Sequence, residues 1–366
     1  MDRKKRIIFT VSNDISFDRR MQRICGTLSE SGYDVLLVGR LMSDSKELAD
    51  FNFSCKRLKC WFSIGKAFYA EFNIRLFFLL LFSRFDIGSA VDLDTALAVL
   101  ISTRLRGKKS FLDAHEYFPF VPEVERRPSI KSAWEKIENV CIPKFDVVYT
   151  VSQSIADTYQ QQFHRPVGLI RNMPDEETGA SPGFDERKAV VIYQGAINEG
   201  RGLEEAVKAM ASVDAELWLL GKGDIYEFLV LEVSRLGLEE KVRFFGWVDP
   251  RDLPGLTIQA RVGLNLLENR SKSYYFSLAN KFFDYVQAGL PAIHMSFPEY
   301  EALNKQKEVC VLLEDLNEEL IASSINSLLS DRDKWSRINA NCMEARKDWN
   351  WQKESQKLIE LYEQNG

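Results

Sequence analysis

Short apolar runs rich in β-branched residues alternate along the chain with longer segments whose apolar positions recur every three or four residues. Runs of the first kind are typical of strands buried on both faces, and segments of the second kind are typical of helices that cover a sheet. Their alternation predicts β-α-β units and parallel sheets. The predicted strands form two series, over 6–12, 34–39, 109–113 and 146–151, and over 189–194, 215–220, 241–245, 262–267 and 291–294. The predicted helices lie near 18–31, 94–105, 130–141, 152–163, 202–210, 224–236, 278–288 and 317–330.

The apolar pattern is lost between the two series, in the stretch DEETGASPGFDER at residues 175–187. Glycine, proline, serine and charged residues replace the apolar ones there, as in linkers between domains. We therefore expect two domains of class α/β, each with its own doubly wound sheet. With 366 residues, of which 45% are hydrophobic, the chain is long enough to bury two cores.

One segment, residues 66–82, is unusually apolar. Glu71 and Arg75 interrupt it, and its uncharged run is too short to cross a bilayer. Two interpretations stay open for this segment. It is either a core helix or an interfacial helix that rests the first domain on a membrane.

Charge is distributed unevenly along the chain. The formal net charge is −5, but residues 1–170 hold 25 Lys+Arg against 20 Asp+Glu, so the remainder carries −10. Basic clusters at 3–6, 56–59 and 104–109 favour an anionic partner. Phospholipid fits better than nucleic acid because no stacking platform or nucleic-acid motif accompanies the clusters. An ordinary solvated face is the alternative.

The N-terminal stretch has only a short apolar run after its basic start, unlike a signal peptide, so we expect a cytoplasmic protein. The six cysteines form no CxxC pair and the three histidines lie far apart in the sequence. Neither a disulfide framework nor a zinc site is therefore indicated.

Glycines directly follow three strands of the second series, at the ends where doubly wound sheets bind ligands. Gly195 follows the first of these strands, and Arg201 lies where the next helix begins, which suits a phosphate group. The next strand is followed by Gly221 and Lys222, and the third by Gly246 with an aromatic neighbour that could border a base. One such glycine is usually only a turn, but three in succession favour a ligand-lined cleft.

The helix predicted at 278–288 carries a polar stripe beside its apolar one. Asn280, Asp284 and Gln287 share one side of a helix with 3.6 residues per turn. Asn280 and Lys281 lie in the first turn and favour an anion, and Asp284 can accept hydrogen bonds from hydroxyl groups. A sugar nucleotide offers both a diphosphate and a ribose. The alternative is a helix cap with an ion pair between Lys281 and Asp284.

In the first half of the chain, His115 follows a predicted strand together with Asp113 and Glu116. Lone histidines are more often packed or solvated than catalytic, but the carboxyl end of a parallel strand, facing the expected gap between domains, favours a functional role. Four polar residues after the first strand could contact a second substrate, namely Asn13, Asp14, Arg19 and Arg20.

Five stretches occur in the order in which a known family has them, namely DAHEYFP, VYTVSQSIADTY, YQGAINEGRGLEEAVKAM, VRFFGWV and SLANKFFDYVQAGLP. On these stretches the chain resembles retaining glycosyltransferases of the GT-B fold, in the large family 4 group, and most closely the bacterial members that build surface polysaccharides. The resemblance covers nearly the full length, and the last stretch is the most specific. The end of the chain, DWNWQKESQKLIELYEQ, resembles the family's closing helix, which crosses back onto the first domain.

The resemblance implies a GT-B architecture of two Rossmann-like domains that face each other across a cleft. Residues 1–172, with the closing helix at 348–366, would bind the acceptor, 173–187 would be the linker, and 188–347 would bind the nucleotide sugar. Transfer in this family retains the anomeric configuration and typically needs no metal, so protein cations and helix termini must stabilise the leaving group. The resemblance therefore implies no metal and no other cofactor, with the nucleotide sugar as a substrate.

The resemblance also assigns roles by position. Arg201 stands where the family usually has a diphosphate-binding lysine, and Asp284 stands where the second glutamate of an E-x7-E motif binds ribose. His115 corresponds to a histidine near the donor sugar and the reaction centre.

Two positions depart from the family pattern. Ala196 stands where an arginine usually follows the first glycine, and Lys281 or Lys222 can supply the missing charge. Phe276 stands where the first glutamate of E-x7-E would lie, and a phenyl ring cannot hydrogen-bond sugar hydroxyls.

We therefore expect a cytoplasmic glycosyltransferase, peripheral on the inner face of the cell membrane. It would move a hexose-type sugar from a UDP- or GDP-linked donor to a lipid-linked or saccharide acceptor in surface polysaccharide biosynthesis, with no role for nucleic acid. Two alternatives stay open: a nucleotide-sugar epimerase of the same fold, and a non-catalytic sugar-nucleotide-binding subunit of a polysaccharide assembly complex.

Overall fold

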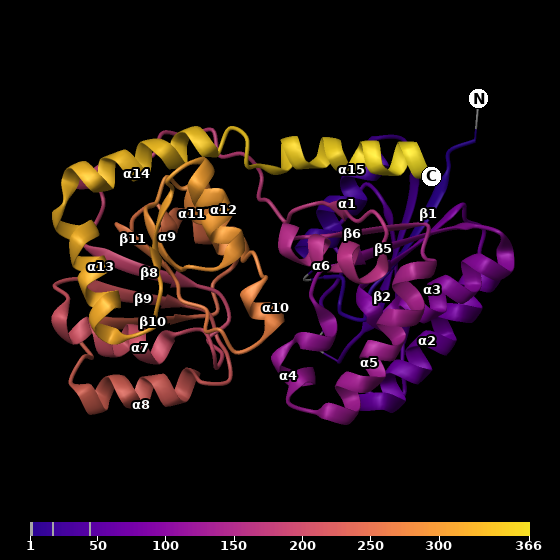
Figure 1. Ribbon diagram of the computed structural model, residues 1–366, viewed down its shortest axis with the longest axis horizontal. Helices are drawn as coiled ribbons and strands as arrows, with labels where there is room; N and C mark the ends of the chain where they lie inside the picture. The colour runs from indigo at the N-terminus through magenta and orange to yellow at the C-terminus, as the bar shows by residue number, and fades with distance from the viewer. Residues whose placement is uncertain (1–2, 17, 44) are drawn as a thin grey trace. The chain divides into compact units, whose positions relative to one another are not determined.

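The computed structural model describes residues 3–16, 18–43 and 45–366 (Figure 1). Its contacts divide the chain into two compact units. The first unit comprises Met1–Asn172 together with Glu354–Gly366, and the second comprises Met173–Lys353. Each unit has one sheet whose paired strands all run parallel, so the predicted α/β fold with two doubly wound sheets is confirmed.

The first unit has a seven-stranded sheet in the order β3-β2-β1-β4-β5-β6-β7. Its strands are β1 (Arg6–Thr10), β2 (Asp34–Leu41), β3 (Ser54–Lys59), β4 (Ile87–Val91), β5 (Lys109–Ala114), β6 (Val147–Thr150) and β7 (Gly168–Leu169). Its helices are α1 (Arg19–Glu30), α2 (Gly65–Phe82), α3 (Asp92–Arg106), α4 (Pro122–Glu125), α5 (Pro128–Cys141), α6 (Gln153–Phe163) and most of α15 (Trp351–Asn365), with short 3-10 turns at Phe118–Phe120 and Ile142–Lys144. Figure 1 shows α2, α3 and α5 on one side of this sheet, and α1 and α15 on the other.

The second unit has a six-stranded sheet in the order β10-β9-β8-β11-β12-β13. Its strands are β8 (Val190–Gln194), β9 (Glu216–Leu220), β10 (Val242–Gly246), β11 (Val262–Asn265), β12 (Ala292–Met295) and β13 (Cys310–Leu313). Its helices are α7 (Leu203–Ala209), α8 (Tyr226–Leu236), α9 (Leu253–Thr257), α10 (Lys272–Tyr275), α11 (Asn280–Gln287), α12 (Pro298–Gln306), α13 (Glu318–Ser330) and α14 (Arg332–Ala345), with 3-10 turns at Phe184–Glu186 and Met210–Ser212.

Every predicted strand overlaps a strand of the structure, but the sequence pattern missed β3, β4, β7 and β13. Strand β4 lies in the middle of the first sheet between β1 and β5, and all its residues are buried. Gly88 and Ser89 interrupt its apolar run, which is why the pattern missed it. Gly88 is required because a Cβ there would lie 2.7 Å from Cγ2 of Thr103 on α3.

The order of strands reverses between β1 and β4 in the first unit and between β8 and β11 in the second. The chain segments that follow the strands on the two sides of such a point run in opposite directions away from it. The carboxyl ends of the strands are therefore left uncovered there. In the second unit, the segments that follow β8, β9 and β10 and the start of α11 therefore surround one edge of the sheet.

The apolar segment at 66–82, for which two interpretations were open, forms helix α2. Phe68, Phe72, Leu76 and Leu80, spaced four residues apart, are buried, so the helix does contribute to the core. Ile74, Phe78 and Phe82 are exposed on another side of it. Among the described residues, no helix combines the length and the apolar character needed to cross a membrane.

The last helix, α15, contributes residues 354–366 to the first unit, although residues 173–353 intervene in the sequence. Tyr362 on this helix is fully buried, with its ring centre 4.5 Å from that of Phe111 on β5. Its hydroxyl oxygen lies 3.2 Å from the Ser89 hydroxyl and 3.2 Å from the Tyr149 hydroxyl. The contacts join α15 to three strands in the middle of the sheet.

Replacing Tyr362 by alanine should lower the free energy of unfolding by about 3–5 kcal/mol, because it leaves a cavity between α15 and the sheet. Tyr362→Phe keeps the ring and should cost about 1 kcal/mol through its lost hydrogen bonds. The neighbouring Glu363→Ala, at an exposed position, is the control. Chemical denaturation measures all three, and an unchanged transition in Tyr362→Ala would show that α15 does not stabilise the first sheet.

Candidate functional site

Three glycines form adjoining turns at the carboxyl ends of β8, β9 and β10. The backbone N–H of Gly195 donates to the carbonyl of Leu220 at 2.9 Å, and that of Gly221 donates to the carbonyl of Gly246 at 2.8 Å. Gly221 has a φ of +147°, and a Cβ there would lie 1.8 Å from the carbonyl oxygen of Gly195. Only glycine fits this position. Because the two hydrogen bonds join the three glycine turns, the turns form one surface of bare backbone. Lys222 is exposed beside it, with Cε 3.7 Å from where a Cβ of Gly246 would lie.

Lys281, the second residue of α11, lies against the first of these turns. Its side chain is only 9% exposed, and its Nζ lies 4.0 Å from the centre of the Tyr193 ring on β8. The same Nζ is 3.5 Å from where a Cβ of Gly195 would lie. Burial, followed by the charge of Arg201, lowers the pKa of Lys281 to about 7, against the opposing effect of Asp284. The ammonium group is therefore poorly stabilised by its surroundings.

Arg201 precedes α7, and its charge is close enough to act on Lys281. Its guanidinium carbon lies 5.1 Å from the centre of the Tyr274 ring, and its buried Nε has no hydrogen-bond partner among the described residues. Like charges that repel in the free protein attract a polyanion together. Lys281 and Arg201, the two predicted cations, thus lie close enough to act on the same anion beside the glycine turns.

Asp284 and Asn280 lie on the same helix as Lys281 but differ in exposure. Oδ2 of Asp284 accepts a hydrogen bond from Nε2 of Gln194 at 2.9 Å, while Oε1 of Gln194 accepts one from the Thr257 hydroxyl at 2.7 Å. Asn280 is exposed at the start of α11. This chain of bonds fixes the Asp284 carboxylate close to the end of β8.

The predicted polar stripe does not extend to Gln287. This side chain is buried, accepts a hydrogen bond from the backbone N–H of Glu177 at 2.9 Å and donates to the carbonyl of Trp349 at 2.9 Å. It joins α11 to two segments of the same unit. Its role is structural, because tertiary contacts cover the last turn of the helix.

An open pocket of about 570 Å³ follows β10. It is lined by Phe245, Trp247, Val248, Asp249, Arg251, Asp252, Gly255 and Leu256. Trp247 is 56% exposed and directly follows the Gly246 turn. A flat apolar side chain in this position can contact the face of a planar base.

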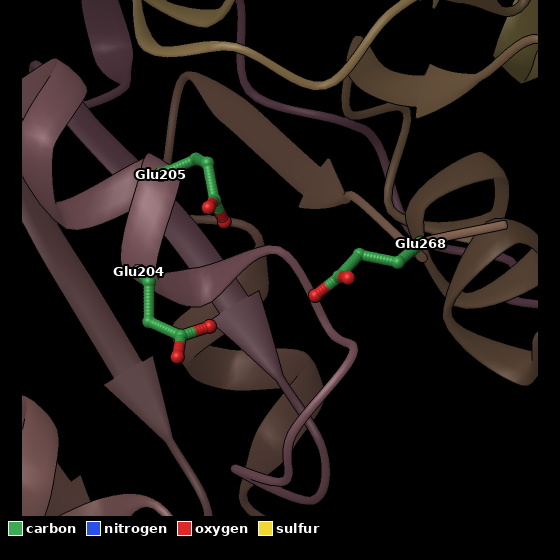
Figure 2. Close-up of side chains that lie close together, drawn as sticks. All are labelled: Glu204, Glu205 and Glu268. Atoms are coloured by element: carbon green, nitrogen blue, oxygen red, sulfur yellow. The ribbon is translucent and has the colours of Figure 1, made fainter. Parts of the chain in front are cut away.

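A cluster of carboxylates, which sequence reasoning missed, lies near the start of α7. Figure 2 shows Glu204 and Glu205 on the helix and Glu268 on the segment after β11, pointing toward them. One oxygen from each lies within 4.8 Å of the others. Burial, then the charges of Glu205 and Glu268, raises the pKa of Glu204. Arg270 also pairs with Glu268 and Glu199, so part of this negative charge is neutralised.

His115 of the first unit lies among two carboxylates and an arginine after β5. Its Nε2 lies 3.0 Å from Oδ2 of Asp113, and its backbone N–H donates to Oδ1 of Asp92 at 2.7 Å. Burial alone lowers the pKa of His115, but Asp113 and Asp92 outweigh it and raise the pKa to about 9. Nε of Arg20 also approaches His115 Nε2, at 2.8 Å. This nitrogen accepts from Arg20 when unprotonated and donates to Asp113 when protonated, so it can gain or lose a proton in place.

The four residues expected to contact a second substrate divide into two buried and two exposed ones. Arg20 is 5% exposed and pairs with the fully buried Asp113, with Nη2 2.9 Å from Oδ1. Asp14 is 7% exposed and accepts hydrogen bonds from the backbone N–H and hydroxyl of Ser16 at 2.9 and 2.8 Å. Asn13 and Arg19 are exposed.

Sequence reasoning missed Asp92 and Asp94 because it missed strand β4, which they follow. Asp92 has a left-handed backbone, with a φ of +55° that is rare for a residue other than glycine. Burial raises its pKa to about 8, although His115 opposes the shift. Burial likewise raises the pKa of Asp94 to about 6, despite a short hydrogen bond from Ser12. The run FDIGSAVDLD, in which two carboxylates follow an apolar stretch, is the signal that could have identified them.

Comparisons with known proteins agree with this arrangement. Residues 174–345, nearly all of the second unit, match the family model described as Glycosyl transferases group 1. The match indicates a glycosyltransferase.

Among curated proteins, spore coat protein SA of Bacillus subtilis (strain 168) is 24% identical over 271 residues, which cover 64% of this chain and 70% of that protein. Sucrose-phosphate synthase of Thermosynechococcus elongatus has a similar structure, with a TM-score of 0.82 at 16% identity, over 99% of both chains. HepE of Anabaena in complex with UDP-glucose has a TM-score of 0.76 at 14% identity, over 98% of this chain and 99% of that one. These similarities confirm the predicted GT-B fold class.

The buried ammonium of Lys281 should make stability depend on pH. At pH 6 the residue is charged in both the folded and unfolded states, so Lys281→Met should raise the free energy of unfolding by on the order of 4 kcal/mol. From about pH 7 to 10.5 only the unfolded parent protein keeps this proton, so the parent gains stability and the advantage of Lys281→Met should shrink.

Chemical denaturation between pH 6 and 10 measures this change. The exposed Lys305→Met is the control and should leave the free energy of unfolding within about 0.5 kcal/mol of the parent at each pH. A stability difference for Lys281→Met that stays constant with pH would contradict a desolvated ammonium group.

Proposed function

We propose that this protein is a retaining glycosyltransferase that moves a hexose-type sugar from a nucleoside diphosphate, UDP or GDP, to a lipid-linked or saccharide acceptor in surface polysaccharide biosynthesis. The observation that carries the proposal is the pair of cations, Lys281 and Arg201, beside the backbone surface at Gly195 and Gly221. The pair lies in the unit that matches the glycosyltransferase family. We assign the protein to the cytoplasm, on the inner face of the cell membrane.

The diphosphate of the donor would lie between the glycine turns and the two cations. Helix α11 begins without a side-chain cap at Ala279, so its first-turn N–H groups add to the positive potential there, and the neutral Asn280 lies in the same turn. A phosphate next to Lys281 favours the charged ammonium, which burial otherwise disfavours. Binding energy is thus largest when the leaving group carries its full negative charge, as it does when the sugar departs.

The nucleoside would extend from the diphosphate across the ends of β8 and β10. Asp284, held by Gln194, would accept hydrogen bonds from the ribose hydroxyls. Lys222 and Gly246 would border the nucleoside, and the base would lie in the pocket at Trp247. The UDP-glucose bound to HepE of Anabaena supports a uridine donor.

The first unit would bind the acceptor. His115, with its raised pKa, would orient the transferred sugar by hydrogen bonds that do not require it to lose its proton at neutral pH. Asn13 and Arg19 are exposed and available to the acceptor. Arg20 would act through His115, which it contacts, and Asp14 would act by holding its own loop.

A non-catalytic sugar-nucleotide-binding subunit is the second candidate. Two departures from the family pattern favour it. Ala196 supplies no phosphate-binding charge, and Phe276 supplies no carboxylate for the hydroxyls of the donor sugar. Both candidates predict nucleotide binding, so only turnover separates them.

Arg201→Ala should lower the rate of nucleotide release from a nucleotide sugar by about 10²–10³, because it removes one cation that stabilises the leaving diphosphate. The assay mixes the protein with a panel of nucleotide sugars and cell-derived lipid and measures released nucleotide. Arg332→Ala, an exposed arginine paired with Asp185 in the same unit, is the matched control and should retain full activity.

Thermal shifts with UDP, GDP and ADP separate the two candidates. Stabilisation by one nucleotide with Arg201-dependent release supports the transferase. Stabilisation without turnover on any acceptor supports the binding subunit, and no stabilisation by any of the three would contradict both.

Transfer should need no metal ion, because the protein's own cations would stabilise the diphosphate. Activity in an excess of EDTA should therefore equal activity in added Mg²⁺ or Mn²⁺. The carboxylate cluster of Glu204, Glu205 and Glu268 provides the direct counter-test. Activity that EDTA removes, that Mn²⁺ restores and that Glu268→Gln makes insensitive to Mn²⁺ would show a metal-dependent reaction.

A further inference from the structure

We infer that the outward face of α2, together with the loop before it and the adjoining part of α3, is a docking surface for an anionic phospholipid bilayer. We call it the α2 surface. Its apolar side chains are exposed, and they are Trp61, Ile74, Phe78, Phe82, Ile101 and Leu105.

The apolar residues of α2 lie on two different sides of the helix. One stripe is buried, as described above, and accounts for the packing of the helix on the sheet. Phe78 and Phe82 lie on another side, one turn apart, with their rings stacked at 6.4 Å and an interplanar angle of 7°. Phe82 is 81% exposed. Packing within the unit therefore explains the first stripe but not the second.

The loop before α2 holds Trp61 against the same helix. The Glu71 carboxylate accepts hydrogen bonds from the backbone N–H groups of Trp61 and Phe62, each at 3.0 Å. Arg75 pairs with Glu71 at 2.7 Å and lies 4.9 Å from the centre of the Trp61 ring. Trp61 is nevertheless 85% exposed. A fixed backbone thus presents a large aromatic side chain to the outside.

Helix α3, the neighbour of α2, extends the surface. The two helices lie side by side (Figure 1), and the Ser102 hydroxyl of α3 donates to the carbonyl of Phe77 on α2 at 3.4 Å. Ile101 and Leu105, on either side of Ser102 along α3, are 49% and 66% exposed. The exposed apolar residues therefore come from neighbouring turns of two packed helices.

The charges around the α2 surface favour a negatively charged partner. The segments 74–85 and 95–112 contain arginine and lysine but no carboxylate. Arg84, Arg104 and Lys109 are exposed. Asp86, the next carboxylate along the chain, is already engaged by Arg3 at 2.7 Å and Lys108 at 3.2 Å.

An apolar centre with aromatic side chains and a basic border is the composition of surfaces that lie in the headgroup region of a bilayer. Anionic lipid attracts the border, and the apolar side chains leave water as they enter the lipid. The exposed apolar residues of α8 in the second unit, such as Phe228 and Leu231, have the acidic neighbours Glu227 and Glu232 instead. The α2 surface is thus the better match to an anionic membrane.

The inference deepens the proposed function, because a lipid-linked acceptor lies in such a membrane, but lipid binding is measured without donor or acceptor. The full chain is sedimented with vesicles of phosphatidylcholine alone and of phosphatidylcholine with 30 mol% phosphatidylglycerol. Binding to the anionic vesicles should be at least ten-fold tighter and should weaken in 0.5 M NaCl because salt screens the cations.

The variant Phe78→Gln/Phe82→Gln should weaken this binding about ten-fold or more, and Arg84→Gln/Lys109→Gln should weaken it on anionic vesicles alone. Both pairs are exposed, and circular dichroism checks that each variant folds. Phe228→Gln/Leu231→Gln, a pair on α8 in the second unit, is the control and should bind like the parent.

Three outcomes would overturn the inference. They are the absence of binding to anionic vesicles, equal binding by the Phe78/Phe82 variant, and a self-associated form in light scattering that the same variant converts to monomer. The last outcome would assign the surface to a second copy of the chain. If the parent protein binds anionic vesicles but releases no nucleotide from any nucleotide sugar, the proposed transfer is refuted and the inference on the α2 surface is not.

Discussion

The second unit carries a buried ammonium, that of Lys281, on which the charge of the Arg201 guanidinium also acts. Lys281 lies between the Tyr193 ring and the Gly195 turn, and its charge is opposed both by burial and by Arg201. Such a group costs folding free energy unless something compensates it. The π face of Tyr193 and the nearby Asp284 give partial compensation, and a bound diphosphate would give more.

The glycine turns and the cations depend on each other. A side chain at Gly221 would collide with the backbone of Gly195, so the chain must leave bare backbone at this point of the sheet edge. The same bare backbone lets a ligand approach the cations closely. In the first unit a comparable site forms at the reversal of strand order, where Asp92, Asp113 and Arg20 surround His115. Both sites lie at the carboxyl ends of parallel strands, the part of the fold that helices leave uncovered.

The strands and helices that follow a simple pattern could be predicted from the sequence, and the exceptions have a physical reason. Strand β4 was missed because Gly88 and Ser89 break its apolar run, and the glycine is required because Thr103, on the helix that directly follows the strand, leaves no room for a Cβ. Missing β4 also hid Asp92 and Asp94, whose carboxylates shape the surroundings of His115. Gln287 had the spacing of a ligand-binding residue, but the chain near Trp349 covers it. The spacing of residues along a helix shows on which side of the helix a side chain lies. It does not show which part of the protein packs against that side.

The sequence by itself predicted the fold class and named Arg201, Lys281, Asp284 and His115 as candidates, because these follow from local periodicity and from residues next to strand ends. The tertiary structure alone decided which charges are buried together. It brought Arg20 into contact with His115, and Glu268 close to Glu204. It also buried one apolar side of α2 in the core and left the other apolar side exposed. Burial and electrostatic coupling act between residues far apart in the chain, and no local pattern encodes them.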